Sequence, residues 1–367
     1  MEIDFEAEGL LEGTSGEARE ARLGLLRQLA ADGVELEELK TAVEEKRLAL
    51  LPVERVLEGD PGELMTGNEI AEESGLEVEP LLRQRRALGL PDVDPDEPVL
   101  GSNDLEAAKR VKAFRDAGMP EDAMLEMARV IGMSMSQVAA ANRAMIRDHL
   151  FEEGDTERDV GFKLAAAARE LGPLVGDSLQ FVLNMHLREQ VRGDVVSEAN
   201  LTPGSAGVSE ITACFLDMVG FTSLGEQMPP EDLGRVTGRL GEIAADVATA
   251  PVRLVKMIGD AAMLVAPETG PVLDAALAMI DAAAAEGEDF PLLRGGVAQG
   301  PGIARGGDWY GRPVNLASRI TGVARPGSVL ATEAVKEAAE PYSYSFAGEK
   351  RLKGIQGRVR LFRVRLN

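Results

Sequence analysis

The pattern of apolar residues changes near residue 208, and this change constrains the fold more than any other feature of the chain. Before it, leucines recur at three- and four-residue spacing between charged residues, as in EARLGLLRQLAADGVELEELK. Such spacing predicts amphipathic helices around a small core. After it, apolar runs typical of strands, such as ITACFLDMVGF and VRLVKMI, alternate with helical runs such as PVLDAALAMIDAAAAE. The second half is therefore expected to form helices packed on an antiparallel or mixed sheet.

Two domains are expected, because 367 residues exceed what one hydrophobic core usually fills. Residues 1–156 read as helical throughout. Residues 157–204 read as a connector, in which two helices are predicted to meet at Gly172-Pro173, since proline breaks an existing helix and is tolerated in the first turn of a new one. The stretch LTPGSAG, residues 201–207, is typical of a short linker.

The charge balance excludes some classes of partner. The chain carries 62 acidic and 39 basic residues, a formal net charge of −23. This charge repels the phosphates of nucleic acids and anionic membrane surfaces, so nucleic acid is not an expected partner. No apolar stretch is long enough to span a bilayer, and the first residues, MEIDFEAEGLLEG, lack the features of a signal peptide. We therefore expect a cytoplasmic protein with no membrane partner.

The single cysteine, Cys214, lies inside the apolar run ITACFLDM. With no second cysteine in the sequence, an intramolecular disulfide and a cysteine-based zinc site are both excluded. Its apolar neighbours predict a core residue rather than a reactive thiol.

The segment EIAEESGLEVEPLLRQR has the spacing of a helix-turn-helix, with Gly75 at the turn. Its context, about residues 66–133, resembles the winged-helix heads of MerR-type regulators. In such a head the second helix would meet DNA, yet here that helix carries Glu77 and Glu79 beside three arginines. Both a DNA-binding head and a tri-helical regulatory fold fit this pattern, and the acidic background favours the regulatory fold.

Two aspartates occupy costly positions at the ends of apolar runs. Asp217 follows CFL and precedes a glycine-containing turn, and Asp260 lies in MIGDAAM, which predicts a tight hairpin. A carboxylate in such a place costs free energy unless a cation meets it. Either aspartate alone is typical of a turn-capping residue. Together they could hold a pair of hard divalent cations through oxygen.

At this point the sequence resembles the catalytic domain of the class III nucleotide cyclases. FLDMVGFTSLGE is similar to the first metal motif of that family, KMIGDAAM to its hairpin with the second metal aspartate, and DWYGRPVNLASRI to its nucleoside and transition-state motif. The three motifs occur in the family's order, and the resemblance extends over roughly residues 205–367. It implies an α+β fold, the ferredoxin-like class III cyclase sandwich, preceded by a mostly α-helical regulatory domain.

The resemblance implies a role for four charged residues in these motifs. Asp217 and Asp260 would hold two divalent cations, Mg²⁺ or Mn²⁺. Lys256 and Asp308 would read the purine edge, and this pairing is the one that the family uses for adenine.

Four further residues match positions that act on the ribose and the phosphates. Asn315 would orient the ribose, and Arg319, four residues later on the same helix face, would stabilise charge on the reacting phosphate. Arg294 in LLRGGVAQG and Lys353 in RLKGIQG match basic positions that meet the triphosphate, through looser motifs. Trp309, the only tryptophan, fits a packing role and a nucleotide contact equally well.

The implied function is an adenylyl cyclase that converts ATP to 3′,5′-cyclic AMP and pyrophosphate. In this family the sites lie at the subunit interface of a dimer, so a homodimer is implied. The arrangement also resembles actinobacterial cyclases with a helical regulatory domain over residues 1–156, whose input could be a small molecule or pH. His186 could sense pH, although an ordinary helix-surface histidine fits its pattern better. The alternative is a DNA-binding or signalling regulator whose cyclase-like half only senses nucleotide.

Overall fold

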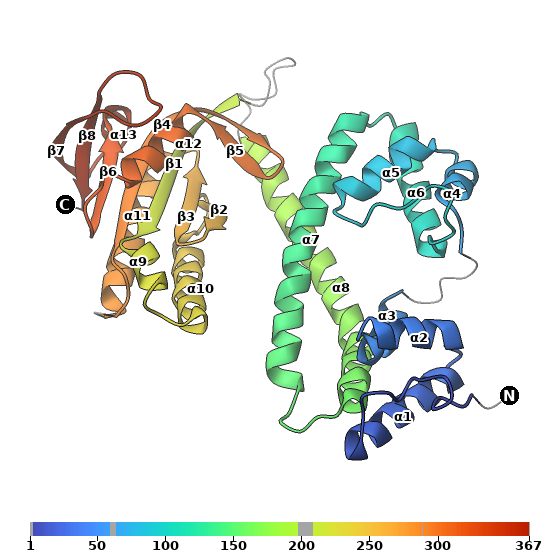
Figure 1. The fold of residues 1–367 in the computed structure, drawn as a ribbon. Helices are drawn as coiled ribbons and strands as arrows, with labels where there is room; N and C mark the ends of the chain where they lie inside the picture. The colour runs from blue at the N-terminus through green and yellow to red at the C-terminus, as the bar shows by residue number, and fades with distance from the viewer. Residues whose placement is uncertain (1–2, 59–63, 197–207, 288, 367) are drawn as a thin grey trace. The chain divides into compact units, whose positions relative to one another are not determined.

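The computed structural model describes residues 3–58, 64–196, 208–287 and 289–366 (Figure 1). Contacts between residues divide the chain into a helical unit, residues 1–193, and a sheet unit, residues 194–367. This division falls within the predicted connector. The predicted linker, residues 201–207, lies outside the described residues.

The helical unit is built from amphipathic helices around two small cores. The first core contains Leu25, Leu26 and Leu39, and the second contains Ile70 and Leu105. The helices are α1 Gly16–Ala31, α2 Leu36–Glu44, a 3₁₀ turn at Leu48–Leu50, α3 Leu51–Glu58, α4 Gly67–Ser74, α5 Val78–Ala87, α6 Ser102–Asp116, α7 Glu121–Leu150 and α8 Glu157–Val196. In the described ranges no helix is long and apolar enough to cross a membrane.

The helices α4 and α5 form the helix-turn-helix segment. Thr66 caps α4, because its side chain accepts a hydrogen bond from the backbone N–H of Glu69, whose carboxylate accepts one from the backbone N–H of Thr66. Gly75 ends α4 with φ +73°, a left-handed conformation that glycine adopts without strain.

Acidic residues accompany the arginines of α5. Arg83 pairs with Glu121 at 2.7 Å, Arg85 pairs with Asp104, and Arg86 pairs with Glu79 at 2.8 Å and with Asp92 at 3.3 Å. These acids offset the charge that a DNA-reading helix would present to phosphates. The pairing favours the regulatory fold over the DNA-binding head.

The connector differs from the sequence prediction. Helix α8 runs without a break through Gly172 and Pro173, so the prediction of two helices meeting there is wrong. Proline inside a helix removes one hydrogen bond and crowds the carbonyl four residues earlier, at a cost of about 3 kcal/mol. That carbonyl belongs to Arg169, which is exposed, so water can hydrate the group that the proline leaves unpaired.

In the described part of the chain eight strands form one mixed sheet, in the order β2-β3-β1-β4-β6-β8-β7, with β5 paired to β4. Neighbouring strands are antiparallel except β4 and β6, which are parallel. The strands are β1 Val208–Met218, β2 Arg253–Ile258, β3 Ala261–Ala266, β4 Leu293–Arg305, β5 Asp308–Gly311, β6 Ser328–Thr332, β7 Ser343–Lys350 and β8 Val359–Arg365. Two of them, β5 and β7, were not predicted as strands from the sequence.

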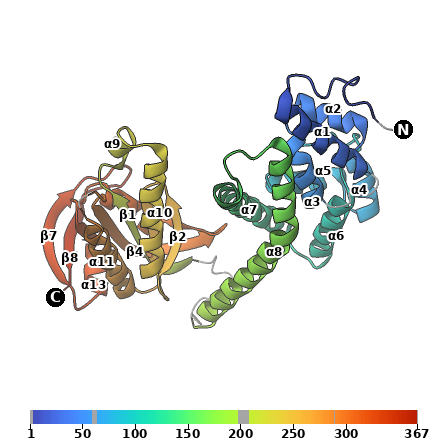
Figure 2. The ribbon, with the colours of Figure 1, turned by 90° about the horizontal axis from the view of Figure 1, so that it is seen from below.

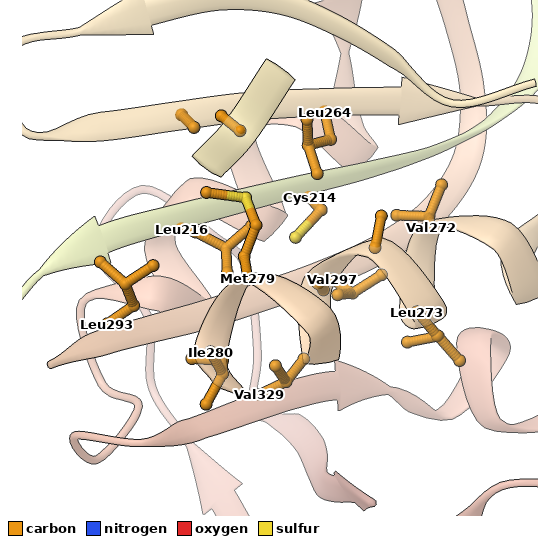
Figure 3. Close-up of a cluster of buried hydrophobic side chains, with 14 of the residues drawn as sticks. Cys214, Leu216, Leu264, Val272, Leu273, Met279, Ile280, Leu293, Val297 and Val329 are labelled. Carbon is orange, nitrogen blue, oxygen red and sulfur yellow. The ribbon is translucent and has the colours of Figure 1, made fainter. Parts of the chain in front are cut away.

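Helices cover both faces of the sheet. The sheet unit contains α9 Phe221–Gly225, α10 Pro230–Val247, α11 Thr269–Ala285, α12 Arg312–Thr321 and α13 Glu333–Ala338. Figure 2 shows α10 and α11 side by side along one face of the sheet. Figure 3 shows Val272 and Met279 of α11 with Cys214 and Leu216 of β1 in the larger core, to which α10 contributes Leu240. Cys214 is fully buried, as predicted, and burial raises the pKa of its thiol, which keeps it inert.

On the other face α12 packs against β1 and β4. Ile211, Ala213 and Phe215 point toward this face, because alternate residues of a strand point to opposite sides. Leu316 and Ile320 of α12 complete this second core. Asp217 continues the series of alternate residues and therefore belongs to the α12 face.

Gly296 of β4 permits the close approach of α12. A Cβ atom built on Gly296 would lie 2.5 Å from both Ala317 O and Thr321 N of the α12 backbone. Thr321 also anchors the helix, because its buried hydroxyl donates to Phe215 O at 3.1 Å or to Ala317 O at 2.9 Å. Any side chain at position 296 would push α12 away from the sheet.

We expect Gly296→Ala to lower the stability of the sheet unit by about 1–3 kcal/mol, because the helix backbone must shift to admit the methyl group. Gly295→Ala is the matched control, since its Cβ would meet mainly side-chain atoms, Val329 Cγ2 at 3.2 Å being the nearest. The measurement is the midpoint of thermal unfolding. Equal midpoints for the two variants would contradict this account of the packing.

Candidate active site

Strand register places three charged residues at one end of the sheet. Asp217 lies opposite Ala261 of β3 on one side and opposite Arg294 of β4 on the other. Asp260 immediately precedes Ala261, and its carbonyl accepts a hydrogen bond from the backbone N–H of Met218 at 3.0 Å. The pairing of three strands therefore brings Asp217, Asp260 and Arg294 together.

The position of Asp260 depends on a tight hairpin. Ile258 pairs with Ala261, so Gly259 and Asp260 form a two-residue turn between β2 and β3. Gly259 has φ +60°, and among the described non-glycine residues a positive φ occurs at Lys46 and not at Asp260. A glycine at the first turn position fits the geometry of a type II′ hairpin. The predicted tight hairpin is confirmed.

Arg294 forms an ion pair with Asp217. Its Nε and Nη2 both donate to Asp217 Oδ2, at 2.9 and 2.5 Å. The side chains are 29% and 23% exposed, so the pair is partly desolvated and solvent screens it less than a surface pair. Sequence reasoning predicted Arg294 as a triphosphate contact, whereas in the structure it holds a predicted metal aspartate.

The environment of Asp260 disfavours its ionised form. Burial raises the pKa of its carboxyl above the ordinary value, and the negative charge of Asp217 raises this pKa further. The backbone N–H of Asp260 and the charge of Arg294 act in the opposite direction. Two carboxylates that repel each other in this way form a place where a cation lowers the energy.

Lys256 and Asp308 form a second charged group. Lys256 Nζ donates to Asp308 Oδ2, joining the β2–β3 hairpin to the start of β5. The other carboxylate oxygen of Asp308 accepts a hydrogen bond from the backbone N–H of Trp309 at 2.8 Å. Trp309 packs against the smaller core, so the structure gives this residue a packing role.

The remaining predicted residues lie at the surface. Asn315 and Arg319 are both exposed and lie four apart on α12, so they occupy one face of the helix. Lys353 is exposed in the loop that joins β7 to β8. Among the described residues, no hydrogen bond or ion pair links these three side chains to either charged group. The structure thus brings five of the eight predicted site residues into two groups.

Sequence reasoning missed the residues that position α12. These are Gly296 and Thr321, which set the distance between the helix and the sheet. The signal was present in the pair of glycines in LLRGGVAQG, because glycine inside a strand marks the close approach of another backbone.

The residues at the end of β1 fit divalent cations with hard oxygen ligands. Two carboxylates on adjacent strand ends match the way Mg²⁺ is usually bound, through one or two carboxylates plus substrate phosphates. Among the described residues no group of three or more His, Cys, Asp or Glu side chains is placed to hold a metal ion. A Mg²⁺ ion held by two carboxylates would keep coordination positions for phosphate oxygens or water.

Both units match known families. Residues 3–191 match the adenylate cyclase regulatory domain, and residues 205–365 match the adenylate and guanylate cyclase catalytic domain. The chain belongs to the adenylate cyclase family. It is therefore an enzyme, and the predicted α+β cyclase domain behind a helical regulatory domain is confirmed.

Two curated relatives resemble the cyclase along most of its length, and a solved structure resembles a smaller part of it. A protein named pH-sensitive adenylate cyclase from Mycobacterium tuberculosis is 39% identical over 99% of this chain and 92% of the relative. A protein named adenylate cyclase from Streptomyces coelicolor is 30% identical over 73% of this chain and 69% of the relative. A solved adenylyl cyclase from P. aeruginosa is 20% identical, with a TM-score of 0.38, over 44% of this chain and 95% of that one.

The two aspartates should affect the stability of the metal-free cyclase in opposite directions. The folded state raises the pKa of Asp260 above the ordinary value of 3.8. Ionisation of Asp260 therefore lowers the free energy of unfolding as the pH rises from 3.8 through the raised pKa. We expect Asp260→Asn to match the wild type at pH 3 and to unfold at a higher temperature at pH 7. Asp217→Asn should lose about 1 kcal/mol or less at pH 7, because Arg294 loses its partner.

The measurement is thermal unfolding in EDTA at pH 3 and at pH 7. If the Asp260→Asn variant were less stable than the wild type at pH 7, the folded state would not disfavour the ionised form of Asp260.

Proposed function

We propose that the cyclase converts ATP to 3′,5′-cyclic AMP and pyrophosphate at composite sites of a homodimer. One observation carries this proposal. In the described part of the chain no hydrogen bond or ion pair joins the two charged groups, Lys256 with Asp308 and Asp217 with Asp260 and Arg294, although a single hairpin contributes to both. One group has the chemistry to read a base, and the other has the chemistry to bind cations and phosphates.

Lys256 and Asp308 suit the edge of adenine. The ammonium of Lys256 donates only, and the carboxylate of Asp308 accepts only. Adenine offers a ring nitrogen that accepts and an amine that donates. Guanine has a carbonyl oxygen where adenine has the amine, and that oxygen would face the Asp308 carboxylate with no hydrogen to share. The pair therefore favours ATP over GTP.

The reaction requires the ribose 3′-hydroxyl to attack the α-phosphorus in line as pyrophosphate leaves. Two divalent cations, Mg²⁺ or Mn²⁺, held by Asp217 and Asp260 would activate the hydroxyl and neutralise phosphate charge. Asn315 would orient the ribose, and Arg319 from the same helix face would stabilise the charge that develops on the phosphate. Catalysis by these side chains is positioning and electrostatics.

Arg294 and Lys353 are proposed to hold the triphosphate. Arg294 lies beside the predicted metal aspartates, and its guanidinium can contact two phosphate oxygens at once. Lys353 is an exposed cation on the β7–β8 loop.

A homodimer is proposed because the β2–β3 hairpin contributes Lys256 to one charged group and Asp260 to the other. Lys256 and Asp260 are four residues apart, and we propose that they serve two different active sites. Helix α8 supports a partner, because from Leu174 onward it exposes large apolar side chains such as Leu174, Phe181 and Val191. A second copy of the chain would cover such a helix.

Regulation by the helical unit, in the form of autoinhibition, is the second part of the proposal. Helix α8 leads out of this unit and contains a proline at which a bend costs little. The input could be a small molecule or pH, and the relative named pH-sensitive supports pH. His186 is exposed on α8, as an ordinary surface histidine is.

Product identification tests the reaction. We expect the full chain with Mn²⁺ and ATP to form cyclic AMP, which chromatography separates from cyclic GMP formed from GTP. Lys256→Ala should lower kcat/KM for ATP by about 10- to 100-fold, because a base contact of this kind is worth about 1–3 kcal/mol. Asp260→Ala should lower turnover by about 10²-fold or more. A wild-type chain that forms no cyclic AMP would refute the assignment.

Comparison of the full chain with residues 205–367 tests the regulation. We expect the fragment to be more active than the full chain under at least one condition of pH, because the restraint by the helical unit is removed. Specific activity is measured from pH 5 to pH 8 at several protein concentrations. Equal activities throughout would contradict autoinhibition.

A further inference from the structure

We propose that Arg294 is an internal counter-ion that keeps divalent cations from Asp217 until a nucleotide arrives. The inference rests on the proposed role of Asp217 as a metal ligand. It adds that the binding of the metal and the binding of the nucleotide are coupled, because Arg294 changes its partner from Asp217 to the triphosphate.

The geometry of the ion pair is the first step. Both donors of Arg294 converge on Oδ2 of Asp217, across directly opposed positions of β1 and β4. A guanidinium there competes with a cation for Oδ2 and offsets the negative charge that would attract the cation to Asp217. The charge of Arg294 also reaches Asp260, so both predicted ligands are affected.

The permanence of the arginine charge is the second step. A guanidinium does not lose its proton in proteins, so Arg294 cannot yield to a cation by becoming neutral. It must move or accept a like charge at close range, and in a partly desolvated site this repulsion is costly. A divalent cation alone therefore meets resistance in the nucleotide-free enzyme.

The release of Arg294 is the third step. Among the described residues Arg294 also donates a hydrogen bond from Nη1 to Gly322 O at the end of α12, and at 3.5 Å this bond is long. A triphosphate offers oxygens that guanidinium binds in bidentate fashion. Transfer of Arg294 from Asp217 to the triphosphate frees the carboxylate at the moment when the substrate is present.

The consequence is reciprocal coupling. If the nucleotide strengthens cation binding by releasing Arg294, the cation strengthens nucleotide binding by the same factor. Without the arginine, the cation should bind the empty enzyme more tightly.

The test measures Mn²⁺ binding to the full chain without nucleotide, by the electron paramagnetic resonance signal of free Mn²⁺. Arg294→Gln removes the charge and keeps a hydrogen-bonding side chain, and we expect it to tighten Mn²⁺ binding about tenfold, within the usual range of such couplings. Arg294→Lys keeps the charge and should bind Mn²⁺ much as the wild type does. Arg253→Gln, an exposed position on β2, controls for the change in net charge.

The counter-ion role is supported if Arg294→Gln binds Mn²⁺ more tightly than the wild type while Arg294→Lys and Arg253→Gln do not. A variant that merely disturbed the structure would bind Mn²⁺ more weakly. Unchanged or weaker binding in Arg294→Gln overturns it. A second comparison measures Mn²⁺ binding to the double variant that carries both Asp217→Asn and Arg294→Gln. If this double variant binds Mn²⁺ as tightly as Arg294→Gln does, Asp217 is not a metal ligand, and the proposed function fails at that point together with the inference.

Discussion

The antiparallel pairing of β1 with β3 and β4 is the constraint on which the rest of the site depends. It places Asp217 between Asp260 on one side and Arg294 on the other. A shift of one residue in either pairing would turn the side chains of that strand to the opposite face. The buried residues of β1 prevent such a shift, because Cys214 and Leu216 fill one core while Ala213 and Phe215 fill the other.

The same register also determines where α12 can act. Asp217 lies on the α12 face of the sheet, and Gly296 on β4 lets the helix backbone approach that face closely. The buried face of α12 fixes its rotation, and the opposite face presents Asn315 and Arg319 to solvent. A single close contact between backbones thus connects the packing of the sheet unit with the side chains proposed to act on ribose and phosphate.

Sequence reasoning found the parts of the site that follow from local chemistry. Gly259 and Asp260 specify a tight hairpin because few residues tolerate that turn, and the apolar periodicity of β1 and α11 follows from burial. It did not find what depends on tertiary context. The pairing of Arg294 with Asp217 needs the register of β1 and β4. Helix α8 continues through Pro173 although the local rule for proline predicts a break, and β7 becomes a strand by pairing with β8.

Lys256 and Asp260 of one hairpin are proposed to serve two different active sites. Complementation tests this arrangement most directly: Lys256→Ala chains and Asp260→Ala chains, each of low activity alone, are mixed and allowed to exchange subunits. Each heterodimer would then contain one site with both residues intact. Random pairing of equal amounts predicts about one quarter of wild-type activity. Mixed chains that form heterodimers, as shown by differently tagged subunits, and yet stay inactive would contradict the account.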